Sequence, residues 1–167
     1  GIEPIRLVEL LPSFTSRSPI ECRLIEVDLS QKPDYEALSY VWGDPSRTIA
    51  ICVDYCKMEV TENLWSALFR LRLKRKPKVI WADALCIDQQ STDDKRRQVQ
   101  IMRDVYKTAS QVIIWLGEHT DSSEILHCAK ELQTDEELAQ MNASCEQPSQ
   151  IAALSHLLQR PWFSRTW

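Results

Sequence analysis

Two carboxylates, a thiol and an amide follow one short apolar run in the segment KVIWADALCIDQQ, residues 78–90. The run at residues 79–81 predicts a buried strand, because apolar residues are continuous there. In open α/β sheets, ligand clefts form at the carboxyl ends of strands. We therefore predict a site after this run. Its candidate catalytic residues are Asp83 and Asp88, and its further ligand-binding candidates are Cys86 and Gln89.

A second polar and aromatic group closes the predicted strand at residues 35–42, YEALSYVW. If this strand and the one at residues 79–83 are parallel neighbours, both groups open on one edge of the sheet. Ser39 and Asp44 would then contact a ribose, while Tyr40 or Trp42 stacks on a base beside the turn at Gly43. The alternative is that the aromatic residues belong to the core and the aspartate forms a turn.

The carboxylate Asp83 also has a purely structural interpretation. An ionised group beside a buried strand must be hydrogen-bonded or paired. Asp83 would then cap turn amides or pair with Arg96 or Arg97 of the following helix. Cys86 has a similar alternative, because buried cysteines are commonly inert core residues. Arg97 is therefore a candidate for either a ligand site or a structural network.

Motifs that bind phosphates or metals through a fixed spacing are absent from the sequence. Only three glycines occur, which argues against a glycine-rich phosphate loop. His119, His127 and His156 are scattered along the chain. We predict no metal site and no required cofactor.

Strands and helices alternate along much of the chain, which favours an α/β fold. Residues 5–11 and 20–29 predict an antiparallel pair with one solvated face, and residues 48–60 predict a hairpin that carries Cys52 and Cys56 near its turn. Helices are predicted from Leu64 to Leu71, over 93–109, from Asp121 and from Ser149, and a strand buried on both faces is predicted over 112–116. The expected architecture is a three-layer, mainly parallel sheet flanked by helices, with an added N-terminal antiparallel β meander or hairpin.

Length, composition and charge indicate one soluble globular domain over residues 1–167. The chain has 44% hydrophobic and 26% charged residues, and its formal net charge of -4 gives no reason to expect nucleic-acid binding. Its apolar runs are far shorter than the ~20 residues of a membrane span. We expect a cytoplasmic protein whose six cysteines are free thiols. Because the chain ends with RPWFSRTW, in the middle of a motif, we expect that the domain continues past Trp167.

Four blocks of the sequence resemble the fungal heterokaryon incompatibility (HET) domain, in that family's order. They are YEALSYVWGD, VIWADALCIDQ, RRQVQIMRDVYKTASQVIIWLGE and RPWFSRTW. The resemblance implies an effector domain of fungal non-self recognition that triggers programmed cell death through homotypic or heterotypic protein partners. HET domains have also been related to TIR domains, so the resemblance further implies a TIR-like, flavodoxin-like fold.

Some TIR domains hydrolyse NAD, and the resemblance therefore raises NAD or a related nucleotide as a substrate. In those enzymes a catalytic glutamate follows a Trp-containing motif, and the corresponding place here lies just after Trp167. Three alternatives remain open: the catalytic carboxylate lies past the end of this chain, Asp83 or Asp88 takes its role, or the domain is not a hydrolase. In the last case the chain is a non-catalytic scaffold in which Asp83, Asp88 and Arg97 form a buried network.

Overall fold

The computed structural model describes residues 4–15, 17–118 and 159–163 of the chain. The chain divides into two compact units after Gly117. The first unit contains one seven-stranded sheet. The sheet order is β5-β4-β2-β1-β6-β3-β7. The strands are β1 Ile5–Leu10, β2 Glu21–Val27, β3 Glu36–Tyr40, β4 Thr48–Val53, β5 Cys56–Thr61, β6 Lys78–Trp81 and β7 Gln111–Trp115.

The strand directions are mixed, so the prediction of a mainly parallel sheet is wrong. Strand β1 is antiparallel to both β2 and β6, and β4 is antiparallel to β5. Parallel pairing joins β6, β3 and β7, and also joins two residues of β2 to β4. The predicted α/β class is confirmed, but continuous parallel pairing is limited to one end of the sheet.

The predicted N-terminal antiparallel pair forms, but it lies in the middle of the sheet. Strand β1 pairs with β2 on one side and with β6 on the other. Leu7 and Val8 point to opposite faces, and both are completely buried. The expected solvated face is therefore wrong for β1, because a central strand covered on both faces has none.

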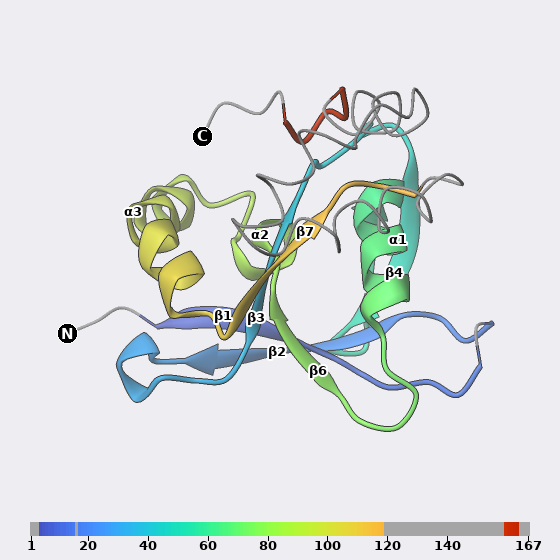
Figure 1. The fold of residues 1–167 in the computed structure, drawn as a ribbon, viewed down its shortest axis with the longest axis horizontal. Coiled ribbons are helices and arrows are strands. Elements are labelled where there is room, and N and C mark those ends of the chain that lie inside the picture. Colours follow the sequence, from blue (N-terminus) through green and yellow to red (C-terminus); the bar gives the residue numbers. More distant parts are fainter. Residues whose placement is uncertain (1–3, 16, 119–158, 164–167) are drawn as a thin grey trace, which may run out of the picture. The chain divides into compact units, whose positions relative to one another are not determined.

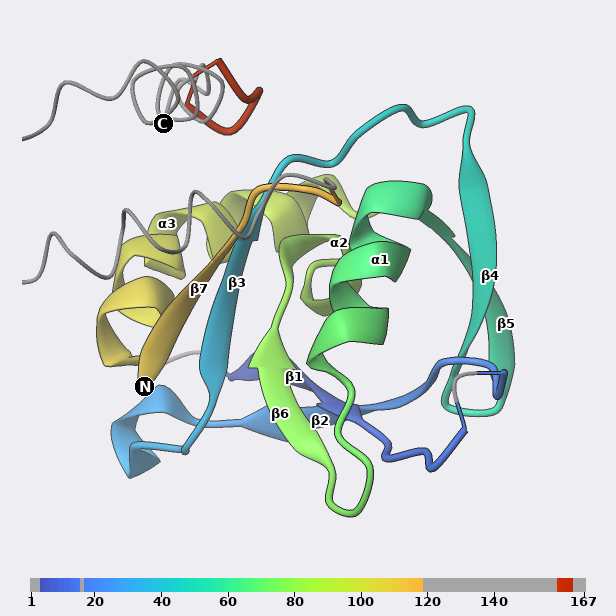
Figure 2. The same ribbon diagram turned by 45° about the vertical axis from the view of Figure 1, so that its right-hand side comes forward.

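Helices cover both sides of the three parallel strands. Helix α1, Glu62–Leu71, begins at Thr61, whose side chain accepts a hydrogen bond from the Leu64 amide. Helix α3, Thr92–Thr108, begins at Ser91, which caps the Asp94 amide. Figures 1 and 2 show these two helices on opposite sides of β3, β6 and β7. Both helices confirm the sequence prediction to within two residues.

The β4–β5 hairpin curls the sheet around α1. Its turn at Asp54 and Tyr55 has positive φ at both positions, as a two-residue hairpin turn requires. Both strands pack on α1, which therefore lies between this hairpin and the central strands (Figure 2). The prediction of a hairpin with Cys52 and Cys56 near its turn is confirmed.

Strand β7 differs from the prediction of a strand buried on both faces. Among the residues that the structure describes, it is the last strand of the sheet order. Val112 is 41% exposed and Ile114 is 49% exposed. The apolar run predicted a central position, which periodicity alone cannot distinguish from an edge. The helices predicted from Asp121 and Ser149 lie outside the described residues, apart from the end of the second.

Candidate functional site

Trp42 and Asp83 meet at the carboxyl ends of two neighbouring strands. Strands β3 and β6 are parallel neighbours, with Ala37 opposite Trp81, so the condition for a shared edge is met. The chain continues from these strands to an indole and a carboxylate, and Trp42 Nε1 donates a hydrogen bond of 2.8 Å to Asp83 Oδ2. We call this pair and its immediate neighbours the Trp42–Asp83 edge.

The Asp83 carboxylate is fixed at both oxygens. Its Oδ1 accepts a hydrogen bond of 2.8 Å from the Ala84 amide, and Asp83 begins the short helix α2, Asp83–Cys86. The sequence analysis did not predict this helix, because four residues carry too little periodicity. Trp42 is 45% exposed, so its hydrogen bond to Asp83 holds an accessible aromatic ring in one orientation.

Two buried groups lie beneath this pair. Burial, followed by the negative charge of Asp83, raises the pKa of Tyr40 well above its ordinary value. Burial raises the pKa of Cys86 to about 12. Both side chains are therefore protonated near neutral pH, and both are shielded from solvent. Tyr40 cannot offer a ring face to a ligand, and Cys86 has neither the access nor the thiolate that a nucleophile needs.

The remaining candidates in β3 and in the turn after it divide between core and turn. Ser39 is only 2% exposed. Asp44 accepts hydrogen bonds from the Ser46 amide at 2.9 Å and the Ser46 hydroxyl at 2.7 Å, and these bonds lower the pKa of its carboxyl. Gly43 has φ +83°, which a residue with a side chain adopts only with strain. Asp44 and Gly43 thus shape the turn that presents Trp42.

Gln89 and Asp88 close the loop after α2. Gln89 Nε2 donates a 3.0 Å hydrogen bond to the Asp83 carbonyl oxygen, and Asp88 Oδ1 accepts one of 2.9 Å from the Gln90 amide. Asp88 is exposed and bonded within its own turn. Asp83, not Asp88, therefore stands beside the exposed indole.

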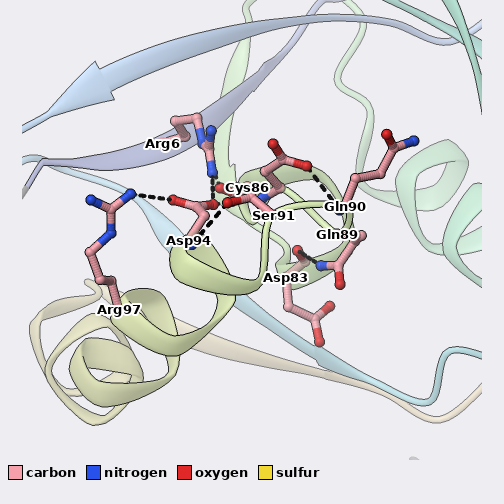
Figure 3. A network of polar contacts seen from close by, with 9 residues as sticks. Arg6, Asp83, Cys86, Gln89, Gln90, Ser91, Asp94 and Arg97 are labelled. Carbon is pink, nitrogen blue, oxygen red and sulfur yellow. Dashed lines mark hydrogen bonds and ion pairs between the residues drawn. The ribbon is translucent and has the colours of Figure 1, made fainter.

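A separate network lies between β1 and the start of α3. Asp94 pairs with Arg6, and its Oδ1 lies 3.7 Å from Arg97 Nη2. Asp94 Oδ2 also accepts a 2.7 Å hydrogen bond from the Asp88 amide, and Arg6 Nε donates one of 2.8 Å to the Cys86 carbonyl oxygen. Figure 3 shows this network with the Asp83 carboxylate pointing away from it.

The hypothesis of a buried network of Asp83, Asp88 and Arg97 therefore needs correction. Arg97 pairs with Asp94, and the second arginine of the network is Arg6. Neither Arg6 nor Asp94 was predicted from the sequence to belong to such a network. No local pattern could have joined Arg6 to Asp94, because 88 positions separate them. A cavity of about 270 Å³ adjoins this network, lined by Pro4, Arg6, Glu26, Asp94, Arg97 and Gln98.

Replacing Asp94 with alanine should destabilise the domain by about 2 kcal/mol, since hydrogen bonds to charged groups contribute ~1.5–3 kcal/mol. The change removes the acceptor for the Asp88 amide and leaves Arg6 without its carboxylate partner. Urea unfolding at neutral pH measures the effect. Glu59→Ala, which breaks the exposed pair with Lys57, is the control and should change stability little. Equal effects of the two variants would contradict a structural role for Asp94.

Cysteine reactivity should follow burial in the folded protein. Burial raises the pKa of Cys22 and that of Cys86 to about 12, whereas Cys56 is exposed. At pH 8 we expect iodoacetamide to label Cys56 quickly and to label Cys22 and Cys86 only after unfolding. Peptide mass spectrometry identifies each labelled residue. Labelling of native Cys86 as fast as that of Cys56 would show that the α2 turn is open.

The described part of the chain offers neither a metal centre nor a membrane span. No group of three histidine, cysteine or carboxylate side chains in it is placed to bind a metal ion. None of its helices has the length and apolarity needed to cross a bilayer.

These features define an α/β protein with a mixed sheet and an aromatic–carboxylate pair at the carboxyl end of its parallel strands. A family model described as Heterokaryon incompatibility protein (HET) matches residues 35–167. The chain belongs to this family, which confirms the resemblance found in the sequence. Trp42 and Asp83 both lie inside the match.

The chain is similar to Heterokaryon incompatibility protein 6, OR allele, of Neurospora crassa. The two are 36% identical over 132 residues, which cover 71% of this chain and 19% of the relative. The chain thus spans about a fifth of the length of that relative. No solved structure matches the chain.

Proposed function

We propose that this chain is an effector module of fungal non-self recognition that triggers regulated cell death. The family and the name of the Neurospora relative support a role in heterokaryon incompatibility. We further propose that the module acts in the cytoplasm through contact with a second copy or another protein, and that the Trp42–Asp83 edge makes this contact.

The main support for this contact is that the Trp42 side chain is exposed and yet held in one orientation. Its indole is 45% exposed yet held by a 2.8 Å hydrogen bond to a carboxylate. Tryptophan is enriched among residues that dominate binding energy at protein interfaces. An aromatic ring that is already fixed loses little conformational freedom on binding, which favours affinity. The turn at Gly43 and Asp44 keeps this ring at the edge of the sheet.

The test is inducible expression, in a compatible fungal strain, of the full-length protein that contains this chain. We expect viable colony counts to fall after induction, and we expect the fall to steepen with expression level because the proposed output depends on association. Undiminished viability at high expression would contradict an effector role. Trp42→Ala should restore viability if the edge makes the contact.

A second candidate function is hydrolysis of an NAD-type nucleotide, and the same pair favours it specifically. Glycosidic cleavage needs a carboxylate near an oxocarbenium-like ribose and a pocket for the leaving base. Asp83 supplies a carboxylate, and the neighbouring Trp42 supplies an exposed face on which a base can stack.

This candidate is tested by incubating NAD with the purified protein extended past Trp167, at high protein concentration. Released nicotinamide is quantified by chromatography, with Asp83→Asn as the control. Nicotinamide release by the parent protein that is absent in Asp83→Asn supports the hydrolase function. No release from the parent protein contradicts the hydrolase function and leaves the association proposal intact.

A non-catalytic scaffold stabilised by Arg6, Asp94 and Arg97 is the remaining alternative.

A further inference from the structure

One amide in helix α1 joins the ends of two parallel strands. Asn63 Nδ2 donates a hydrogen bond to the carbonyl oxygen of Val41, just after β3. Its Oδ1 accepts a 3.0 Å hydrogen bond from Trp115 Nε1, at the end of β7. The Asn63 amide therefore uses its donor at the end of β3 and its acceptor at the end of β7.

Two glycine turns converge on the same side chain. Gly43 follows β3 and has φ +83°, and Gly117 follows β7 and has φ +93°. A Cβ atom added to Gly43 would lie 3.2 Å from Asn63 Cβ, and one added to Gly117 would lie 3.8 Å from Asn63 Oδ1. Both turns thus pass the amide at close range.

The place of Asn63 in its helix explains this reach. It is the second residue of α1, directly after Glu62 and the Thr61 cap. Helical side chains lean toward the helix N-terminus, so an asparagine in the first turn points past the helix end. Here the Asn63 side chain reaches the carboxyl ends of β3 and β7. Its partner after β3 is Val41, the residue before Trp42.

We infer that Asn63 is a positioning residue that fixes Trp42 against Asp83. Its hydrogen bond to Val41 sets the backbone from which the indole projects, and its hydrogen bond to Trp115 anchors the amide itself. This inference rests on the proposed function, and it names Asn63 as the residue that positions Trp42 at the Trp42–Asp83 edge. Its test measures the geometry of the edge rather than killing, so either proposal can fail without the other.

The test follows the indole N–H resonances of Trp42 and Trp115 in ¹⁵N-labelled protein, assigned with Trp42→Phe and Trp115→Phe. Asn63→Leu removes both hydrogen bonds of the amide and should move both resonances upfield, because hydrogen-bonded protons resonate downfield. Asn63→Asp keeps an acceptor for Trp115 but loses the donor to Val41. It should leave the Trp115 resonance close to its parent position and displace that of Trp42.

A third variant, at a different residue, guards against simple loss of folding. Gly43→Ala leaves Asn63 unchanged but places a methyl group against it. We expect it to shift the Trp115 resonance through the amide, although Gly43 itself lies after the other strand. An unchanged Trp42 resonance in folded Asn63→Leu, or an unchanged Trp115 resonance in folded Gly43→Ala, would overturn the inference. If Asn63→Leu unfolds, Asn63→Asp and Gly43→Ala decide it.

Discussion

Replacing Trp81 with alanine should lower the free energy of unfolding by about 3–5 kcal/mol, the usual cost of deleting a large buried aromatic side chain. Trp81 has no exposed surface, and its ring packs edge-on against Tyr106 with centroids 5.4 Å apart. Since small domains are stable by only ~5–15 kcal/mol, this change should remove a large part of the total. The urea midpoint at constant m-value measures it.

Two further variants make the Trp81 experiment specific. Trp42→Ala removes the same type of side chain from an exposed position and should cost only about 1 kcal/mol, the contribution of one hydrogen bond. Trp81→Phe should cost far less than Trp81→Ala, because the buried Trp81 Nε1 has no hydrogen-bond partner among the described residues. Equal losses from Trp81→Ala and Trp42→Ala would contradict the packing described for β6 and α3.

Replacing Asp83 with alanine should abolish killing by the full-length protein while leaving the domain folded. The change removes the acceptor of the Trp42 indole and of the Ala84 amide, so the ring loses its fixed orientation. We expect a stability loss of about 1–2 kcal/mol from these hydrogen bonds. Colony survival after induction measures the function, and urea unfolding of the purified protein verifies the fold.

Matched carboxylates elsewhere provide the controls for Asp83. Asp93→Ala makes the same charge change at an exposed position in the first turn of α3 and should leave killing intact. Asp88→Ala tests the other candidate catalytic carboxylate predicted from the sequence. We expect this variant to kill as efficiently as the parent protein. Loss of killing in Asp88→Ala but not in Asp83→Ala would move the site to the loop after α2.

Local patterns predicted the parts of the fold that depend on near neighbours in the chain. The positions of α1 and α3, the β4–β5 hairpin and the β1–β2 pair all agree with the sequence analysis. These features follow from periodicity and turn chemistry, which act over a few residues. The parallel pairing of β3 with β6, which brings Trp42 and Asp83 to one edge, was considered only as a condition, because it joins distant parts of the chain.

Long-range pairing explains what the sequence analysis missed. Nothing within residues 5–10 shows that β1 enters between β2 and β6, and that choice makes the sheet mixed. The Arg6–Asp94 pair and the Asn63–Trp115 hydrogen bond likewise join residues from distant parts of the chain. Arginine, aspartate and asparagine are common on surfaces, so their types alone do not identify such partners.

The most direct test of the Trp42–Asp83 edge as the functional site is a double-mutant cycle on killing by the full-length protein. Trp42→Ala, Asp83→Ala and the double variant are induced to equal levels, and colony survival is counted. Because the indole and the carboxylate act as one hydrogen-bonded unit, each single variant should restore survival, and the double variant should add nothing further. Killing at the parent level by both single variants, with their folding verified, would contradict the account.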